Sequence, residues 1–199
     1  MLGEKTPLAQ KQAALHILVD LVEHGGAGAH PLITNVALAC IQFGAHANST
    51  VRRAACYGLA VCAQHGAAYV APLVPQVLAC LHAAATRGRG GDPDSPDDDD
   101  FDAARDNAVD AVGRVFRHHG DAGQLDASVL GQWAAWLPCP ADDECNASAA
   151  DFLAALLEGA PAAVAAVRPA LREAAGRTAA LPSTPAPLRA RLEAALAAA

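Results

Sequence analysis

The sequence predicts an all-α protein, a right-handed superhelix of about four to five antiparallel helical hairpins. Three observations support this prediction. Hydrophobic residues make up 53% of the chain but aromatic residues only 4%, which favours closely packed helices over β-sheets. Apolar residues recur at three- and four-residue spacing, as at Val51, Ala55, Leu59 and Cys62, which is typical of an amphipathic helix. Similar segments also return at a regular interval.

The interval is 41 residues. Residues 12–25 and 53–66 align at paired alanines and at a shared His-Gly ending. A third copy begins at Arg105 with an offset of 53, and a fourth begins at Ala147 and restores the 41-residue step. One hairpin of this length cannot bury its apolar face alone, so we expect the hairpins to stack along residues 1–199. This pattern is the signature of HEAT or armadillo repeats.

The expected helices follow in order along the chain. Each intervening helix begins near a proline or a polar residue and ends in a turn, such as the one at residues 44–49. The third unit is longer than the others because it contains an additional acidic segment, residues 88–102. We expect this segment to be an exposed loop between two helices of one hairpin. The predicted helices are 12–25, 31–44, 53–66, 68–85, 105–120, 127–137, 147–161 and 161–180.

The acidic stretch, Gly91–Asp102, contains seven aspartates in twelve residues. The chain has 21 acidic and 14 basic residues, so without this stretch the two signs balance at 14 each. Because the rest of the chain has no net charge and no basic patch, nucleic-acid binding is not expected. Two interpretations stay open: a solvated loop, or an electrostatic surface for a basic partner. A Ca²⁺ loop would need a glycine turn and a closing glutamate, which are missing. The aspartates are Asp92, Asp94, Asp97, Asp98, Asp99, Asp100 and Asp102.

The cysteines are predicted to be small buried apolar side chains in a reducing compartment, because no CxxC pair occurs and most lie in apolar helical runs. A long span from Arg53 to Arg87 also lacks Asp, Glu, Lys and Arg. Gln64-His65-Gly66 and two following prolines interrupt it, which favours buried helices over a membrane span. The cysteines are Cys40, Cys56, Cys62, Cys80, Cys139 and Cys145.

The sequence indicates no enzyme, metal or cofactor. Glycine-rich phosphate loops, nucleophile elbows and HExxH motifs do not occur. His118 and His119 are adjacent, but neighbouring side chains on a helix diverge by roughly 100°, so both cannot easily bind one ion. The recurring His-Gly at residues 24–25 and 65–66 is typical of helix C-termini.

Residues 51–66 resemble the second helix of a HEAT repeat, with its Val-Arg opening. Together with residues 18–26, 104–116 and 132–144, their order resembles the C-terminal HEAT repeats of importin-beta-type karyopherins, in the branch of importins four and five. The resemblance is clearest over 18–157. It implies a nuclear import receptor segment that binds protein cargo in the cytoplasm and the nucleus and at the nuclear pore. The turn aspartate usual in a HEAT unit is replaced near Asn48.

The same resemblance implies the partners. These are basic nuclear cargo of ribosomal-protein or histone type and Phe-Gly nucleoporins, with no direct nucleic acid and no membrane insertion. Family members are longer, so we expect the chain to be the C-terminal part of a longer karyopherin. The GTPase Ran would bind only if the N-terminal repeats were supplied. The alternative function is a HEAT scaffold or adaptor of a non-transport complex.

Candidate partner contacts follow from the family, in which the second helices line the concave face. Outward positions on two of them are then expected at Arg53, Tyr57, Gln64, Asp106, Asp110 and Arg114. Trp133 and Trp136 lie three residues apart on one predicted helix. Two interpretations stay open for them: packing in the core, or an exposed aromatic site for Phe-Gly repeats or cargo.

Overall fold

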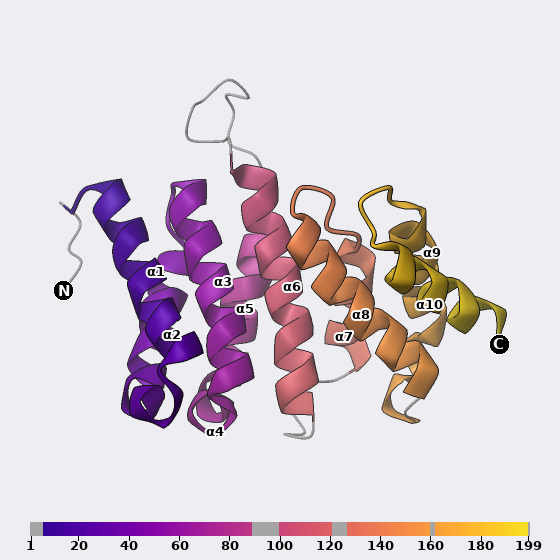
Figure 1. Cartoon of the computed structure of the whole chain (residues 1–199), viewed down its shortest axis with the longest axis horizontal. Helices are drawn as coiled ribbons and strands as arrows, with labels where there is room; N and C mark the ends of the chain where they lie inside the picture. The colour runs from indigo at the N-terminus through magenta and orange to yellow at the C-terminus, as the bar shows by residue number, and fades with distance from the viewer. Residues whose placement is uncertain (1–5, 89–99, 121–126, 160–161, 199) are drawn as a thin grey trace. The chain divides into compact units, whose positions relative to one another are not determined.

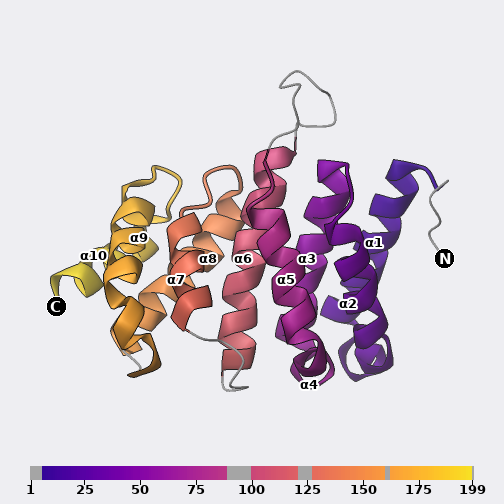
Figure 2. The ribbon, with the colours of Figure 1, turned by 180° about the vertical axis from the view of Figure 1, so that it is seen from behind.

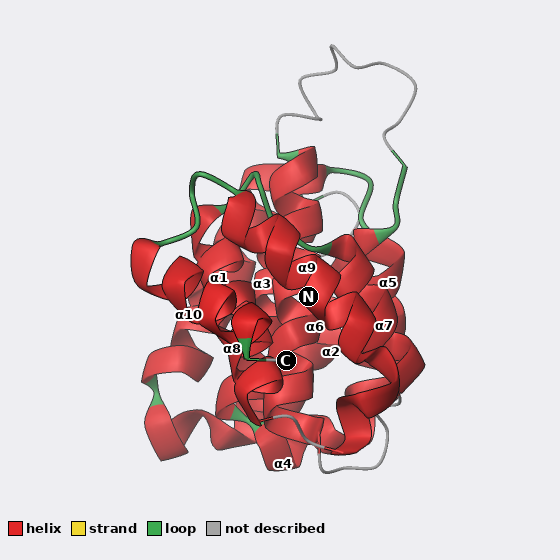
Figure 3. Cartoon of the chain, turned by 90° about the vertical axis from the view of Figure 1, so that its right-hand side faces the viewer, coloured by secondary structure: helices red, strands yellow, loops and turns green. Residues whose placement is uncertain are grey.

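A computed structural model describes residues 6–88, 100–120, 127–159 and 162–198 (Figure 1). Within these ranges the chain contains α-helices and short 3₁₀ helices and no strand (Figure 3). The all-α prediction is therefore confirmed. The chain divides into two units, Met1–His119 and Gly120–Ala199, and each is described by itself.

The first unit has two layers of helices. One layer contains α1, α3 and α6, with α3 packed against both of the others. The other layer contains α2 and α5, which pack on each other and against α3 and α6 (Figures 1 and 2). The elements are α1 (Leu8–His24), η1 (Gly26–Ala29), α2 (His30–Gly44), α3 (Ser49–His65), α4 (Ala67–Val70), η2 (Ala71–Leu73), α5 (Val74–Ala85) and α6 (Phe101–His119).

Small side chains allow the helices of this unit to approach closely. A Cβ atom built on Gly58 of α3 would lie 2.6 Å from Cys40 Sγ and 2.8 Å from Val19 Cγ2. These distances are shorter than real contacts, so only glycine fits between α3 and its neighbours α1 and α2. Cys40, Cys56 and Cys62 contribute to this packing; five of the six cysteines of the chain are buried, and Cys80 is partly exposed. Burial raises the pKa of the Cys62 thiol to about 12, and the prediction of buried cysteines is confirmed for those five.

The turn before α3 is fixed by its own polar side chains. Asn48 is the N-cap residue, and its Oδ1 accepts a hydrogen bond of 3.2 Å from the Val51 backbone N–H. Arg52 is buried, and its Nη1 donates to the carbonyl oxygens of His46, at 3.0 Å, and Ala47. The Arg52 guanidinium also lies 5.8 Å from the centre of the Phe101 ring. Asparagine thus caps the helix at the position where an aspartate was expected.

The single helix predicted over 68–85 is instead α4, η2 and α5 in sequence. Pro72 and Pro75 have no backbone N–H, so the hydrogen-bond ladder cannot run through them, and each instead lies in the first turn of a new element. Within the described ranges, Ala67–Ala85 is long and apolar enough to cross a membrane by length and composition. Of the apolar window in this segment, 28% is buried, and Val74, Val77 and Leu81 are among its buried residues.

The second unit contains four α-helices among its described residues. α10 packs on α8 and α9, and α7 packs on α9 and η5. Arg177 of α9 donates to the carbonyls of Leu137 at 3.1 Å and Ala134 at 2.9 Å, which satisfies acceptors at the C-terminal end of α7. The elements are α7 (Ala127–Trp136), α8 (Asp143–Gly159), η5 (Ala162–Val167), α9 (Arg168–Ala180) and α10 (Ala186–Ala197).

Candidate functional site

The predicted contacts on α3 and α6 meet where the two helices pack together. Arg114 of α6 donates from Nη1 to Gln64 Oε1 of α3 at 3.1 Å, and from Nε to Asp110 Oδ2 at 2.9 Å. Gln64 is exposed, whereas Arg114 is half-buried. Three of the residues that the family resemblance predicted on one face therefore form one hydrogen-bonded group.

A second contact of the same kind joins α1 to α3. The Tyr57 hydroxyl donates to Glu23 Oε2 at 3.0 Å. Partial burial, followed by the hydrogen bond and the negative charge of Glu23, raises the pKa of Tyr57 to about 12. Glu23 was not among the predicted contacts, although the 41-residue repeat places it at the position of Gln64. The repeat alignment was the signal that could have identified it.

We call these five residues the polar ridge: Glu23, Tyr57, Gln64, Asp110 and Arg114. The ridge comprises two hydrogen-bonded groups: Tyr57 of α3 with Glu23 of α1, and Arg114 of α6 with Gln64 of α3 and with Asp110 of its own helix. It contains two carboxylates, one guanidinium and two neutral polar groups, so its chemistry suits hydrogen bonding to a polypeptide. A partner would have to replace some of these internal hydrogen bonds.

The expectation that Asp106 and Asp110 face outward is wrong. Asp106 is 1% exposed and Asp110 is 3% exposed. The guanidinium of Arg105 donates to Asp106 Oδ1 at 2.8 Å, and Arg114 pairs with Asp110. A buried carboxylate needs such a cation or hydrogen-bond donor. Helix α6 buries thirteen of its 19 residues, so helical spacing alone could not identify an outward face.

The end of the acidic stretch is held on α3. Asp100 Oδ2 accepts a hydrogen bond of 2.8 Å from Thr50 Oγ1, and Asp100 Oδ1 forms an ion pair of 3.2 Å with Arg53 Nη1. Arg53, a predicted partner contact, therefore binds this aspartate. Asp102 is exposed in the first turn of α6, where a negative charge is favourable. The predicted contacts outside the described residues are Asp92, Asp94, Asp97, Asp98 and Asp99.

The two tryptophans of α7 differ in exposure. Trp133 is fully buried, and its ring centre lies 5.5 Å from that of Phe152 on α8. The core interpretation is confirmed for Trp133, and a role as an exposed aromatic anchor is excluded for it. Trp136 is half-buried, so its surface role stays a prediction.

The adjacent histidines of α6 lie in different surroundings. His119 is buried, and its Nε2 donates to the Ala63 carbonyl at 3.2 Å. Burial lowers the pKa of both His118 and His119. Among the residues that the structure describes, no group of three or more His, Cys, Asp or Glu side chains is placed to hold a metal ion.

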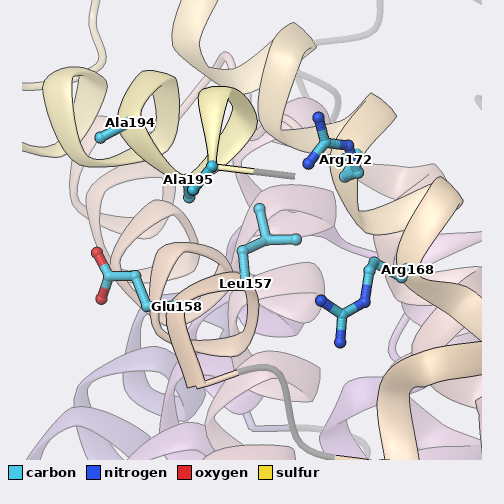
Figure 4. A pocket seen from close by; sticks show the side chains of 7 residues that line it. Leu157, Glu158, Arg168, Arg172, Ala194 and Ala195 are labelled. Carbon is cyan, nitrogen blue, oxygen red and sulfur yellow. The ribbon is translucent and has the colours of Figure 1, made fainter.

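The second unit contains an open hollow of about 440 Å³ between α8, α9 and α10 (Figure 4). The Arg172 guanidinium donates to the Leu196 carbonyl at 2.5 Å. Glu158 is held by Arg191 at 2.8 Å. In Figure 4 the side chains of Arg168 and Leu157 extend toward the same space, which has an apolar side and a cationic side. The lining residues are Leu157, Glu158, Arg168, Arg172, Ala194, Ala195 and Ala198.

A comparison of the chain with protein-family models finds no match. The resemblance to karyopherin-type HEAT repeats stays a prediction from the sequence. The polar ridge and the end of the acidic stretch both involve α3 and α6 of the first unit.

Proposed function

We propose that the protein is a segment of a nuclear import receptor of karyopherin-beta type, a right-handed superhelix of HEAT hairpins that binds basic protein cargo. The 41-residue repeat and the two-layer packing of the first unit support the superhelix. The observation that carries the function is the acidic stretch: seven aspartates lie in Gly91–Asp102, whereas the remaining chain has 14 acidic and 14 basic residues.

Clustered aspartates attract lysine- and arginine-rich segments and speed their encounter, because several of the charges act within one Debye length, about 10 Å at 0.1 M salt. Asp100 contributes less to this attraction, since Arg53 already binds it. The attraction therefore comes mainly from Asp102 and from the five aspartates before Asp100. A basic segment bound to Asp102 would lie at the N-terminal end of α6.

A neutralised variant tests this proposal. We would replace Asp92, Asp94, Asp97, Asp98 and Asp99 with asparagine, leave Asp100 in place, and measure binding of a histone-like basic peptide at low and high salt. We expect roughly a tenfold loss of affinity at low salt and a much weaker salt dependence. The melting temperature should stay the same, because solvated charges contribute little to stability.

The control variant neutralises four exposed carboxylates elsewhere in the chain. These are Asp20, Asp143, Glu144 and Glu193. We expect this variant to bind the peptide within about threefold of the unchanged protein. If both variants bound equally well, or if both lost affinity equally, the acidic stretch would not be a binding surface.

The transport role needs a separate test, which is capture of partners from nuclear extract. Enrichment of Phe-Gly nucleoporins together with basic nuclear proteins is the result expected for an import receptor. A stable set of subunits from another complex, without nucleoporins, would instead indicate a HEAT scaffold.

A further inference from the structure

The hollow between α8, α9 and α10 has a cationic side. Arg168 is the first residue of α9, and Arg172 follows one turn later. Their side chains therefore extend from the same face of the helix, with their Cβ atoms about 5–6 Å apart. In Figure 4 both arginines lie on one side of the hollow, and Ala194 and Ala195 of α10 lie on the other. Two guanidinium groups this close repel each other, and a bound anion relieves that repulsion.

The neighbouring groups leave this positive charge in place. Glu158 is the acidic residue among the described lining residues, and Arg191 binds both of its carboxylate oxygens, at 3.1 and 2.8 Å. The Leu196 carbonyl accepts a hydrogen bond from Arg172, which positions the guanidinium and offsets the negative end of α10. A guanidinium has five N–H donors, so this bond uses only part of what Arg172 offers.

The start of α9 adds to the same charge. The helix has 13 residues, no acidic residue in its first turn and no side-chain cap at Val167. The N-terminal end of a helix carries a positive partial charge, which an acidic side chain in the first turn would offset. Arg168 occupies the first position instead. An anion in the hollow would therefore interact with the helix end as well as with the two arginines.

The rest of the hollow is largely aliphatic. Leu157 of α8 extends into it, and Ala194, Ala195 and Ala198 line it from the C-terminal end of α10. A ligand that carries an aliphatic group beside its negative charges would cover both sides and remove apolar surface from water. The volume of about 440 Å³ lies within the range of ligand sites, about 300–1,000 Å³. The hollow is open, so a peptide chain can enter and leave it.

We propose that this hollow binds an acidic peptide segment in which two acidic residues flank an aliphatic one. In an extended segment, residues two apart point to the same side and lie about 7 Å from each other, close to the spacing of Arg168 and Arg172. The two carboxylates would then bind the arginines through charge-assisted hydrogen bonds. The side chain between them would face the aliphatic side. This partner has the opposite charge to the cargo proposed for the acidic stretch, so the two sites would bind different segments.

Binding of a labelled peptide to the whole chain tests this proposal. The probe is fluorescein-labelled Gly-Ser-Glu-Leu-Glu-Ser-Gly. We would follow its anisotropy up to about 500 µM protein, which covers dissociation constants of tens to hundreds of micromolar. Because the chain has a net charge of −7, it does not attract an acidic peptide as a whole. We expect saturable binding that a Gln-Leu-Gln peptide loses and a Glu-Ser-Glu peptide weakens at least about threefold.

Two pairs of variants locate the binding. Arg168→Gln should weaken it at least about fivefold, whereas Arg87→Gln, which removes the same charge from an exposed position in the first unit, should stay within about twofold. Ala195→Leu keeps every charge but fills part of the hollow, so it should also weaken binding at least about fivefold. Ala190→Leu is its control, because Ala190 is an exposed alanine of α10 outside the hollow. All four variants should give the circular dichroism spectrum of the unchanged chain.

The proposal is overturned if the unchanged chain does not bind the Glu-Leu-Glu peptide in this range. It is also overturned if Arg87→Gln weakens binding as much as Arg168→Gln, or if Ala195→Leu binds the peptide as tightly as the unchanged chain. Should Ala195→Leu change the circular dichroism spectrum, the two arginine variants decide alone. All four variants keep the acidic stretch, so these results are separate from the test with the basic peptide.

Discussion

Helices α1 and α3 have the same length and are related by the 41-residue repeat, yet they differ greatly in burial. α3 buries twelve of its 17 residues, whereas α1 buries four of 17. α3 packs against α1, α2 and α6, whereas α1 packs on α2 and α3. Apolar spacing identifies a face suited to burial. Position among the helices decides how many faces are buried.

Truncating one leucine at the same repeat position in each helix should give the largest effect. Leu59 of α3 is fully buried, and Leu18 of α1, 41 positions earlier, is half-buried. We expect Leu59→Ala to lower the free energy of unfolding by about 2–5 kcal/mol. Leu18→Ala should cost about 1 kcal/mol, because less apolar surface is lost from the core. Urea denaturation measures both values, and equal costs would contradict the comparison.

Alkaline pH should lower the free energy of unfolding through the buried Cys62 thiol of α3. The pKa of Cys62 rises from 9.0 to about 12 on folding because of burial, so above pH 9 the unfolded chain releases this proton while the folded chain keeps it. The contribution of the buried Cys62 thiol to the free energy of unfolding is therefore fully present below pH 9 and is lost as the pH rises toward 12. The loss is about 1.4 kcal/mol at pH 10 for a thiol of this kind.

The pH dependence of unfolding in a Cys62→Ala variant provides the control. Its free energy of unfolding should fall less steeply between pH 8 and about pH 10 than that of the unchanged chain. An unchanged slope would show that Cys62 does not titrate differently in the folded and unfolded states.

The helix N-termini offer a smaller contrast. Asn48 caps α3 through its side chain, whereas Pro7 precedes α1 with no side-chain cap. We expect Asn48→Ala to lower the free energy of unfolding by about 1 kcal/mol, and Asn48→Asp to retain most of the stability because aspartate is also a good cap. If Asn48→Asp and Asn48→Ala were equally destabilising, the cap would not explain the loss.

The polar ridge should give the smallest effect. Tyr57→Phe removes the hydrogen bond to Glu23. Because Glu23 is partly exposed to solvent, we expect the free energy of unfolding to fall by only about 0.5 kcal/mol. The same substitution should leave binding of a basic peptide nearly unchanged, because the charge of Glu23 is kept. A loss of more than about 2 kcal/mol would indicate a role beyond this hydrogen bond.

Much of the fold could be predicted from the sequence. The repeat and the apolar spacing predicted the helices that became α1, α2, α3 and α6. α10 was not predicted, because an alanine-rich helix has little amphipathic pattern, and only Leu192 is buried in it. The break at Pro72 and Pro75 was underestimated, although proline at those positions has a plain physical effect.

The candidate site was harder to predict than the fold. Spacing correctly grouped Gln64 and Arg114, which share a hydrogen bond. The family arrangement placed Asp106 outward, but Asp106 is buried, and Arg105 compensates its charge there. Periodicity within one helix carries no information about which neighbouring helix covers a polar side chain.

The central claim is that α3 packs through a face that is open in α1, and Gly58→Ala tests it most directly. Alanine is favoured over glycine in a helix by about 1 kcal/mol, so without close packing the variant would be more stable. The added Cβ would instead meet Cys40 Sγ at 2.6 Å and Val19 Cγ2 at 2.8 Å, and overpacking of this kind costs about 1–3 kcal/mol. We predict a net loss in the free energy of unfolding that a Val19→Ala background partly removes in a double-mutant cycle. A Gly58→Ala protein as stable as the unchanged chain or more stable, with no coupling to Val19, would contradict the account.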